Sequence, residues 1–297
     1  LFPYTTLFRS LAGVLWRATV PACFCPHCEA RAKREGIDFA RAKAGYAELH
    51  RYIAGLHAGA AAPADGVFTN VLRLLYRYPE ILAWDYQWRL ALEEQGRRTH
   101  TLIKAARPTV QVGRHFDHQN TSWDTLFLAQ YSYADVVPYT DFIKPILYQD
   151  ILGPRIRWWH LERLKKGPLA ELSLQQSLDL YYALRGYDPK VEPALAELEE
   201  RGMSAAYVGR ETRRIAEVVD GRCGVVPGIG VDIPYNIQRP GGPAQFSFRT
   251  RPEAVSASVR AAFAAGATGI LVSREYDEMR LDNLRAIGAT LRELGKV

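Results

Sequence analysis

Residues 224–232, with the sequence GVVPGIGVD, form a short run of apolar residues and glycines that ends on a single aspartate. Runs of this length and composition are typical of strands buried in a parallel sheet. Four further runs have a similar character, and they lie at residues 13–16, 109–115, 142–148 and 268–274. The sequence therefore predicts five strands.

Longer stretches with helical patterning separate and follow these runs, at residues 29–56, 71–107, 123–133, 172–220, 252–265 and 277–294. Breaks are expected near residues 78–79 and 188–189, where prolines interrupt the pattern. The last stretch places Met279, Leu284 and Leu291 on one apolar stripe, as a helix packed on a sheet requires. Alternating strands and helices predict an α/β fold with a parallel sheet, and we expect a partial (β/α)₈ TIM barrel. Residues 153–220 are interpreted as an elaborated connection within it.

Polar side chains gather where four of the five predicted strands end. In a (β/α)₈ barrel the reactive groups lie just past the carboxyl ends of the strands. The candidates at these ends are His115, Asp117, His118, Tyr148, Gln149, Asp150, Asp232, Arg274, Glu275 and Tyr276. A polar loop or a surface ion pair is the alternative interpretation at each position.

This mixture of carboxylates, amides and aromatic rings is typical of sugar-binding sites. Glycoside hydrolysis needs one carboxyl group that donates a proton and a second that stays ionised. We therefore predict a glycosidase in which Asp232 is the nucleophile or base and Glu275 or Asp117 is the general acid, with Asp150 a further candidate. Seven strand-end residues are predicted to bind the sugar: His115, His118, Tyr148, Gln149, Asp150, Arg274 and Tyr276.

Two other functions fit the same residues. A non-catalytic carbohydrate-binding protein would keep the polar and aromatic strand ends without a matched pair of carboxyl groups. A metal-assisted hydrolase is the other alternative, because His115, Asp117 and His118 offer ligands for a divalent ion.

A cysteine cluster lies near the start of the chain. Cys23, Cys25 and Cys28 fall within six residues, while Cys223 stands alone far downstream. Such close spacing is a poor fit to a disulfide framework. A structural zinc ion held by the three thiolates, with His27 or another group as fourth ligand, is one interpretation. Three reduced, metal-free cysteines are the other.

The motif Cys23-x-Cys25-x-x-Cys28 and the helical run after it resemble the zinc loop that follows strand four in some β-galactosidases of the large retaining (β/α)₈ clan. The strand end at 112–115, the residues 147–155 and the closing stretch 273–284 are similar to the same proteins. The resemblance implies that the five predicted strands are strands four to eight. It also places Asp232 at the nucleophile position, where the clan usually has Glu.

The general acid of that clan lies at the end of strand four. Residues 16–19 of this chain, with the sequence WRAT, hold no carboxylate at that point. Three interpretations follow from the resemblance: another strand end supplies the acid, with Glu275 or Asp117 as the expected substitutes; a sequence artefact or frame error has removed it; or the family does not hydrolyse by this mechanism.

Composition narrows the class of protein. The chain has 297 residues, 48% of them hydrophobic and 24% charged, as expected for a globular protein. Its formal charge of +6 comes from basic residues that are scattered instead of clustered, which favours a solvated surface over nucleic-acid binding. No apolar window approaches the length of a membrane helix, and nothing in the sequence indicates a cellular compartment.

The first ten residues, LFPYTTLFRS, look like the translation of a sequencing adapter. We exclude residues 1–10 from the fold and assign residues 11–297 to the C-terminal part of the barrel, read from a metagenomic fragment. Five strands without their partners would leave open sheet edges, which predicts poor folding or homo-oligomers.

Overall fold

The computed structural model describes residues 11–17, 23–123, 125–235, 246–247, 250–273 and 279–297. The chain divides into two compact units. The first comprises Leu1–Gln95 and His160–Leu178, and the second comprises Gly96–Trp159 and Asp179–Val297.

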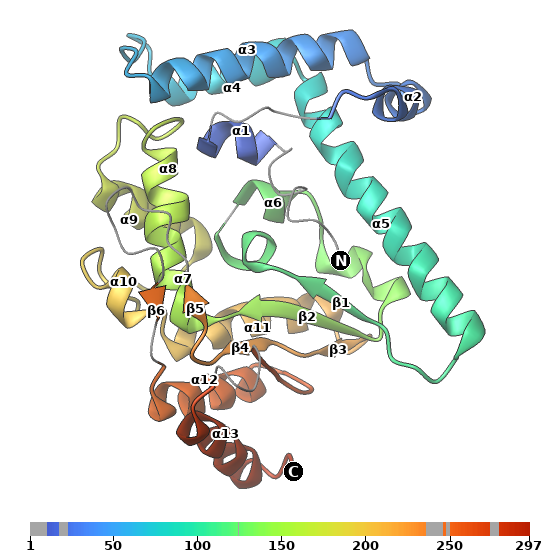
Figure 1. Ribbon diagram of the computed structural model, residues 1–297, viewed down its shortest axis with the longest axis vertical. Coiled ribbons are helices and arrows are strands. Elements are labelled where there is room, and N and C mark those ends of the chain that lie inside the picture. The colour runs from blue at the N-terminus through green and yellow to red at the C-terminus, as the bar shows by residue number, and fades with distance from the viewer. Residues whose placement is uncertain (1–10, 18–22, 124, 236–245, 248–249, 274–278) are drawn as a thin grey trace. The chain divides into compact units, whose positions relative to one another are not determined.

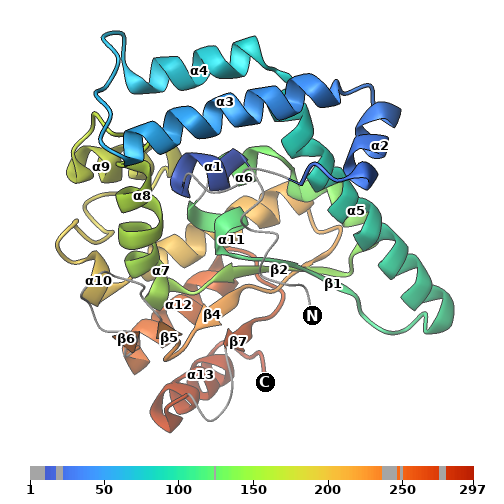
Figure 2. The ribbon, with the colours of Figure 1, turned by 45° about the horizontal axis from the view of Figure 1, so that its top comes forward.

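The described part of the first unit is helical. Its elements are α1 (Leu11–Arg17), α2 (Pro26–Arg34), α3 (Phe39–His57), α4 (Val67–Arg77), the first half of α5 (Glu80–Ala106), α8 (Glu162–Leu164) and the start of α9 (Leu174–Arg185). Helices α3 and α4 lie side by side (Figure 2). The core is aromatic: Phe24 stacks on buried Trp84 with ring centroids 4.8 Å apart, and its edge meets the Tyr46 ring.

The predicted strand at residues 13–16 is wrong, because this segment lies inside helix α1. Residues 11–16 are all buried. A segment that is apolar on every side shows no periodicity, so a short buried helix and a short buried strand look alike in the sequence.

The second unit contains the sheet. Its strands are β1 (Gly113–Phe116), β2 (Phe142–Leu147), β3 (Gly224–Val225), β4 (Gly228–Gly230) and β7 (Leu271–Ser273). The order is β1-β2-β4-β7, with β3 also on β2, and every pairing in this sheet is parallel (β1 to β4 are labelled in Figure 1, β7 in Figure 2). Phe142 lies opposite Gly224 and Ile146 opposite Gly228, so β3 and β4 keep one register along β2. They form a single strand interrupted at Pro227, which has no N–H to donate.

Helices surround this sheet within the second unit. They are the end of α5, α6 (Thr125–Ala129), α7 (Gln149–Arg155), most of α9, α10 (Leu198–Arg201), α11 (Ala205–Val219), α12 (Pro252–Ala264) and α13 (Leu281–Glu293). Short helical turns lie at η2 (Gln119–Trp123), η3 (Tyr133–Asp135), η4 (Val137–Tyr139) and η5 (Ile156–Leu161), and β5 (Pro234–Tyr235) pairs antiparallel with β6 (Phe246–Ser247). Ile215 and Val219 of α11 pack on Ile143 and Val225, which covers one face of the sheet.

Most of the predicted helices are confirmed. The break at residues 78–79 separates α4 from α5, and α12 and α13 lie where the apolar periodicity predicts them. The stretch 29–56 is two helices, because Gly36 has a φ of +72° and the Asp38 side chain caps the next helix by accepting from Arg41 N–H. The stretch 123–133 contains only the short α6 between irregular turns.

The fold is an α/β fold, mostly helical, with a five-strand parallel sheet. The (β/α)₈ barrel stays a prediction. No helix in the described ranges is long and apolar enough to cross a membrane.

Candidate active site at the carboxyl ends of the strands

The face of the sheet opposite α11 carries polar side chains. Side chains alternate along a strand, so residues flanking buried Ile143 and Phe116 point to the opposite face. Lys144 and His115 lie on that face as neighbours in the register of β1 and β2. A Cβ on Gly228 would come within 2.8 Å of the Tyr148 ring and 3.1 Å of Lys144 Cε, so this glycine leaves room for both side chains.

Lys144, Tyr148 and His118 form one contact group. Lys144 Nζ donates a hydrogen bond of 2.9 Å to Tyr148 Oη. The Tyr148 backbone N–H donates to His118 Nε2 at 3.0 Å, so that nitrogen is an acceptor. The other ring nitrogen, Nδ1, faces Arg155 Nη1 at 2.7 Å.

Both histidines of this face are held neutral. Burial lowers the pKa of His118 well below its usual value, and the positive charges of Arg155 and Lys144 lower it further. Burial, followed by Lys144 and Arg114, lowers the pKa of His115 to about 4. At neutral pH these imidazoles therefore add no positive charge to the site.

Asp150 follows β2 at the start of α7 and is 2% exposed. Its Oδ2 accepts from Thr250 Oγ1 at 2.7 Å, and its Oδ1 accepts from Ile151 N–H at 2.9 Å. Burial raises the pKa of Asp150 to about 6, and these hydrogen bonds oppose that rise. A Cβ on Gly230 would overlap Asp150 Oδ1, so the carboxyl group occupies space that the glycine leaves.

Asp232 follows β4 and adopts a φ of +49°, a conformation that Asp tolerates better than most residues. Its carboxylate accepts from Arg280 Nε at 3.1 Å, from Asn283 Nδ2 at 2.7 Å and from Thr250 N–H at 3.2 Å. Burial opposes ionisation, but the hydrogen bonds from Arg280 and Asn283 outweigh it and lower the pKa. This carboxylate is therefore ionised at neutral pH.

Thr250 connects the two carboxyl groups. Its hydroxyl donates to Asp150 and accepts from the Asp232 backbone N–H at 3.0 Å, while its own N–H donates to the Asp232 carboxylate. A buried carboxyl group with a raised pKa and another with a lowered pKa thus lie on either side of one threonine.

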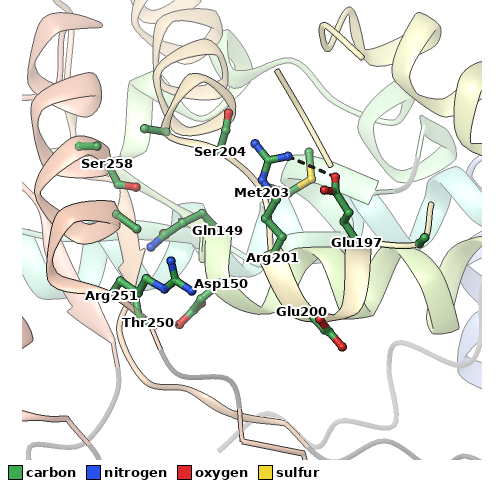
Figure 3. Close-up of a pocket in the computed structure, with 14 residues that line it drawn as sticks. Gln149, Asp150, Glu197, Glu200, Arg201, Met203, Ser204, Thr250, Arg251 and Ser258 are labelled. Atoms are coloured by element: carbon green, nitrogen blue, oxygen red, sulfur yellow. Dashed lines mark hydrogen bonds and ion pairs between the residues drawn. The ribbon is translucent and has the colours of Figure 1, made fainter. Parts of the chain in front are cut away.

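A pocket of about 600 Å³ opens beside Asp150 (Figure 3). Gln149, Met203, Ser204 and Ser258 line it together with Thr250 and Arg251. The Gln149 amide is held in place, because it donates to Gly230 C=O at 2.9 Å and accepts from Gly230 N–H at 3.2 Å. The pocket therefore gives a ligand access to the Asp150 side of the carboxyl pair.

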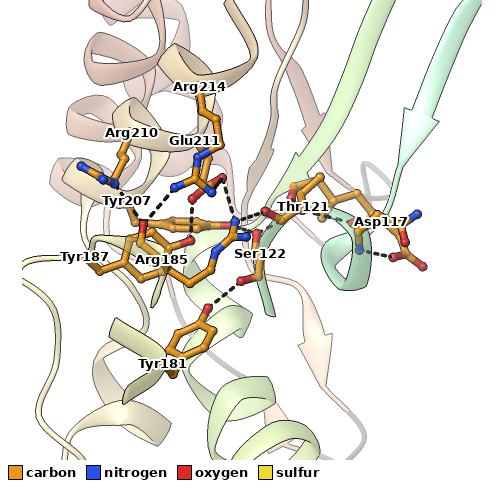
Figure 4. A network of polar contacts seen from close by, with 12 residues as sticks. Asp117, Thr121, Ser122, Tyr181, Arg185, Tyr187, Tyr207, Arg210, Glu211 and Arg214 are labelled. Atoms are coloured by element: carbon orange, nitrogen blue, oxygen red, sulfur yellow. Dashed lines mark hydrogen bonds and ion pairs between the residues drawn. The ribbon is translucent and has the colours of Figure 1, made fainter. Parts of the chain in front are cut away.

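A buried polar network supports the loop that carries Asp117 and His118 (Figure 4). Arg185 and Glu211 are 2% and 1% exposed and form an ion pair of 3.0 Å. Arg185 also donates to Thr121 C=O, and Thr121 Oγ1 donates to Ile146 C=O at 2.8 Å, which ties the loop to β2.

Asp117 begins this loop. Its Oδ1 accepts from Asn120 N–H at 3.4 Å, and its backbone C=O accepts from Thr121 N–H at 3.0 Å. These contacts are those of a residue that starts a helical turn.

The three clustered cysteines lie together at the start of α2 in the first unit. Their Sγ atoms lie within 4.8 Å of one another, and Cys25 Sγ is 3.6 Å from Cys28 Sγ. Hydrogen bonds from Cys28 and Cys23 lower the pKa of Cys25 to about 7, and burial raises the pKa of Cys28 to about 12. The cluster could hold a metal ion.

The structure brings several predicted residues together at the ends of β1, β2 and β4: His115, His118, Tyr148, Gln149, Asp150 and Asp232. Asp117 lies next to them in the chain, and Arg274, Glu275 and Tyr276 lie outside the described residues. Sequence reasoning missed Lys144, Thr250, Arg280 and Asn283. Only Lys144 carried a signal, as a lone charge inside an apolar strand.

No protein-family model, curated protein or solved structure matches the chain. The comparisons therefore identify no family, and the resemblance to β-galactosidases stays a prediction.

Proposed function

We propose that this chain is a glycosidase-like protein that acts on a glycosidic bond beside the carboxyl ends of β2 and β4. Asp150 is the proton donor and Asp232 the ionised partner. The observation that carries the proposal is the opposite direction of their pKa shifts on either side of Thr250.

The chemistry of glycoside hydrolysis needs this division of roles. A general acid needs a pKa raised toward the operating pH, whereas the base, nucleophile or charge stabiliser must be ionised. Environments that separate two carboxyl pKa values in this way support an assignment of acid and base. We assign the acid role to Asp150, and not to Glu275 or Asp117, because Asp150 lines the pocket. Glu275 and Asp117 remain alternative acids.

A second function is favoured by the contacts of Asp232. Its oxygens already accept from Arg280, Asn283 and Thr250, as in a carboxylate that fastens three segments together. A carboxylate so engaged is a weak nucleophile. If its role is to hold the fold, the same pocket binds carbohydrate without cleaving it.

Hydrolysis of a panel of nitrophenyl glycosides tests the first proposal. Replacing Asp150 by Asn is expected to lower kcat roughly 100- to 10,000-fold, the usual contribution of a general acid. Activity of the unchanged protein should also fall as pH rises through about 6, the pKa of Asp150. Asp282→Asn is the matched control, because the Asp282 side chain is 80% exposed. Asp117→Asn and Glu275→Gln test the alternative acids.

Sugar titrations followed by calorimetry separate the two functions. Binding without hydrolysis would support a carbohydrate-binding protein. If the unchanged protein neither binds nor hydrolyses any of the sugars, both functions are rejected.

We also propose that Cys23, Cys25 and Cys28 hold a structural zinc ion. Tetrahedral zinc with Zn–S bonds of about 2.3 Å requires sulfur atoms about 3.8 Å apart, close to the observed Cys25–Cys28 distance of 3.6 Å. A fourth ligand would come from His27, water or another group.

Zinc stoichiometry measured by elemental analysis tests this site. One ion per chain is expected in the unchanged protein, and Cys25→Ser should lose it and lower the melting temperature. Cys223→Ser is the control, because Cys223 lies in the second unit. Equal zinc content in all three proteins would contradict the proposal.

A further inference from the structure

Lys144 is a charged side chain whose counter-ion is missing from the described part of the chain. It is half-buried on β2, and the polar partner of its Nζ among the described residues is the Tyr148 hydroxyl, a neutral group. Arg185, a buried cation of the same unit, has a carboxylate partner, Glu211, at 3.0 Å. Removing a cation even partly from water without an anion is costly, so an unpaired one beside the candidate site residues indicates an anionic ligand.

The surroundings of Lys144 keep this charge uncompensated. His115 and His118 are neutral for the reasons given above, and Arg155 adds a second positive charge beside His118. Tyr148 Oη accepts a hydrogen bond from Lys144 Nζ, so the Tyr148 O–H can donate a hydrogen bond to a ligand. An ammonium and a phenol side by side offer two donors to one anionic group.

The side chains of Lys144, from β2, and Asp150, from α7, lie against the same face of β4. Gly228 makes room for Lys144 and Tyr148, and Gly230, two residues further on, makes room for Asp150. Residues two apart on a strand share a face and are about 7 Å apart. Lys144 and Asp150 therefore lie over neighbouring positions on the same face of the sheet.

We propose that the ligand is an anionic sugar, with a carboxylate or a phosphate ester that binds Lys144 Nζ and Tyr148 Oη. This inference rests on the proposed carbohydrate function and names its substrate class. Lys144 is the specificity-determining residue, and it does not take part in bond cleavage.

Calorimetric titration of the full chain tests the inference with three matched ligands for each common hexose: the neutral sugar, its uronate and its 6-phosphate. At least one anionic form is expected to bind roughly 10-fold more tightly or better than its neutral counterpart, as for a hydrogen bond to a charged group. The comparison of uronate with 6-phosphate identifies which anion the site takes.

Variants locate the effect. Lys144→Gln should abolish the preference for the anionic form while neutral-sugar binding persists, and Lys144→Arg should retain part of it. Lys190→Gln removes an exposed charge of the same unit and should leave the preference unchanged. Increasing salt should weaken binding of the anionic sugar more than that of the neutral sugar.

The possible outcomes are distinct. Equal binding of neutral and anionic sugars, or a preference that survives Lys144→Gln, overturns this inference and leaves the proposed function standing. Absence of binding by every sugar overturns the proposed function and this inference with it.

Discussion

The carboxyl ends of β2 and β4 each carry a buried aspartate, and the two differ in how many groups donate to them. Asp150 accepts from one hydroxyl and from backbone N–H groups, and burial raises its pKa to about 6. Asp232 accepts in addition from the guanidinium of Arg280 and the amide of Asn283, and its pKa is lowered. Both side chains are under 10% exposed.

Burial alone therefore does not decide the charge of a carboxyl group in this protein. The charged form persists where a cation and several donors replace the lost water, and it becomes costly where they do not. Each neighbour of the pair can be changed to test this explanation.

Removing the Asp232 carboxylate should have the largest effect. Asp232→Ala removes the carboxylate that accepts from Arg280, Asn283 and Thr250 and places Ala at a positive φ, and we expect a loss of about 2–4 kcal/mol in the free energy of unfolding. Asp232→Asn keeps an acceptor oxygen and a residue suited to that φ, so it should lose less. Urea unfolding measures both, and equal stability of all three proteins would show that the donors contribute nothing.

The second variant, Gly230→Ala, places a methyl group in the space that the Asp150 carboxyl group occupies. The Cβ of Gly230→Ala would overlap Asp150 Oδ1, so the carboxyl group must move, at a cost of about 2 kcal/mol. Gly269→Ala is the control, because its nearest atoms outside the adjacent chain are Val226 methyl groups at 3.8 Å. Thermal melts of both variants check the prediction, and a loss no greater in Gly230→Ala than in the control would contradict it.

Asp150→Asn should change stability only where the native carboxyl is ionised. Because its folded pKa is raised, the native state holds the proton more tightly than the unfolded chain, and stability falls as pH rises from about 4 to about 6. The Asn variant escapes this loss. It should be about 3 kcal/mol more stable than the unchanged protein above pH about 6, with no such gain below pH about 4. Urea unfolding across this range checks the sign.

Thr250→Val should have the smallest effect. The change removes the hydroxyl shared by the two carboxyl regions, at a cost of about 1 kcal/mol, and it should raise the pKa of Asp150 further because that hydrogen bond favours the anion. Carboxyl carbon chemical shifts followed through a pH titration report the pKa. An unchanged value would mean that Thr250 does not couple to Asp150.

Part of this site was predictable. His115, His118, Tyr148, Gln149, Asp150 and Asp232 follow apolar strands in the sequence, and parallel strands place their carboxyl ends at one edge of the sheet. The partners of Asp232 were not predictable, since Arg280 and Asn283 lie about fifty residues away along the chain, where sequence spacing carries no distance information.

The sequence alone determined the alternation of strands and helices, because side-chain periodicity is a local property that follows from backbone geometry. It also brought three cysteines within six residues, too close for the fold to separate. The tertiary structure decided which aspartate has a raised pKa and which has a lowered one. It likewise decided that residues 11–17 form a helix and that Lys144 contacts the Tyr148 hydroxyl and no carboxylate among the described residues. Burial and the donors around a group come from distant segments, and only packing brings those segments together.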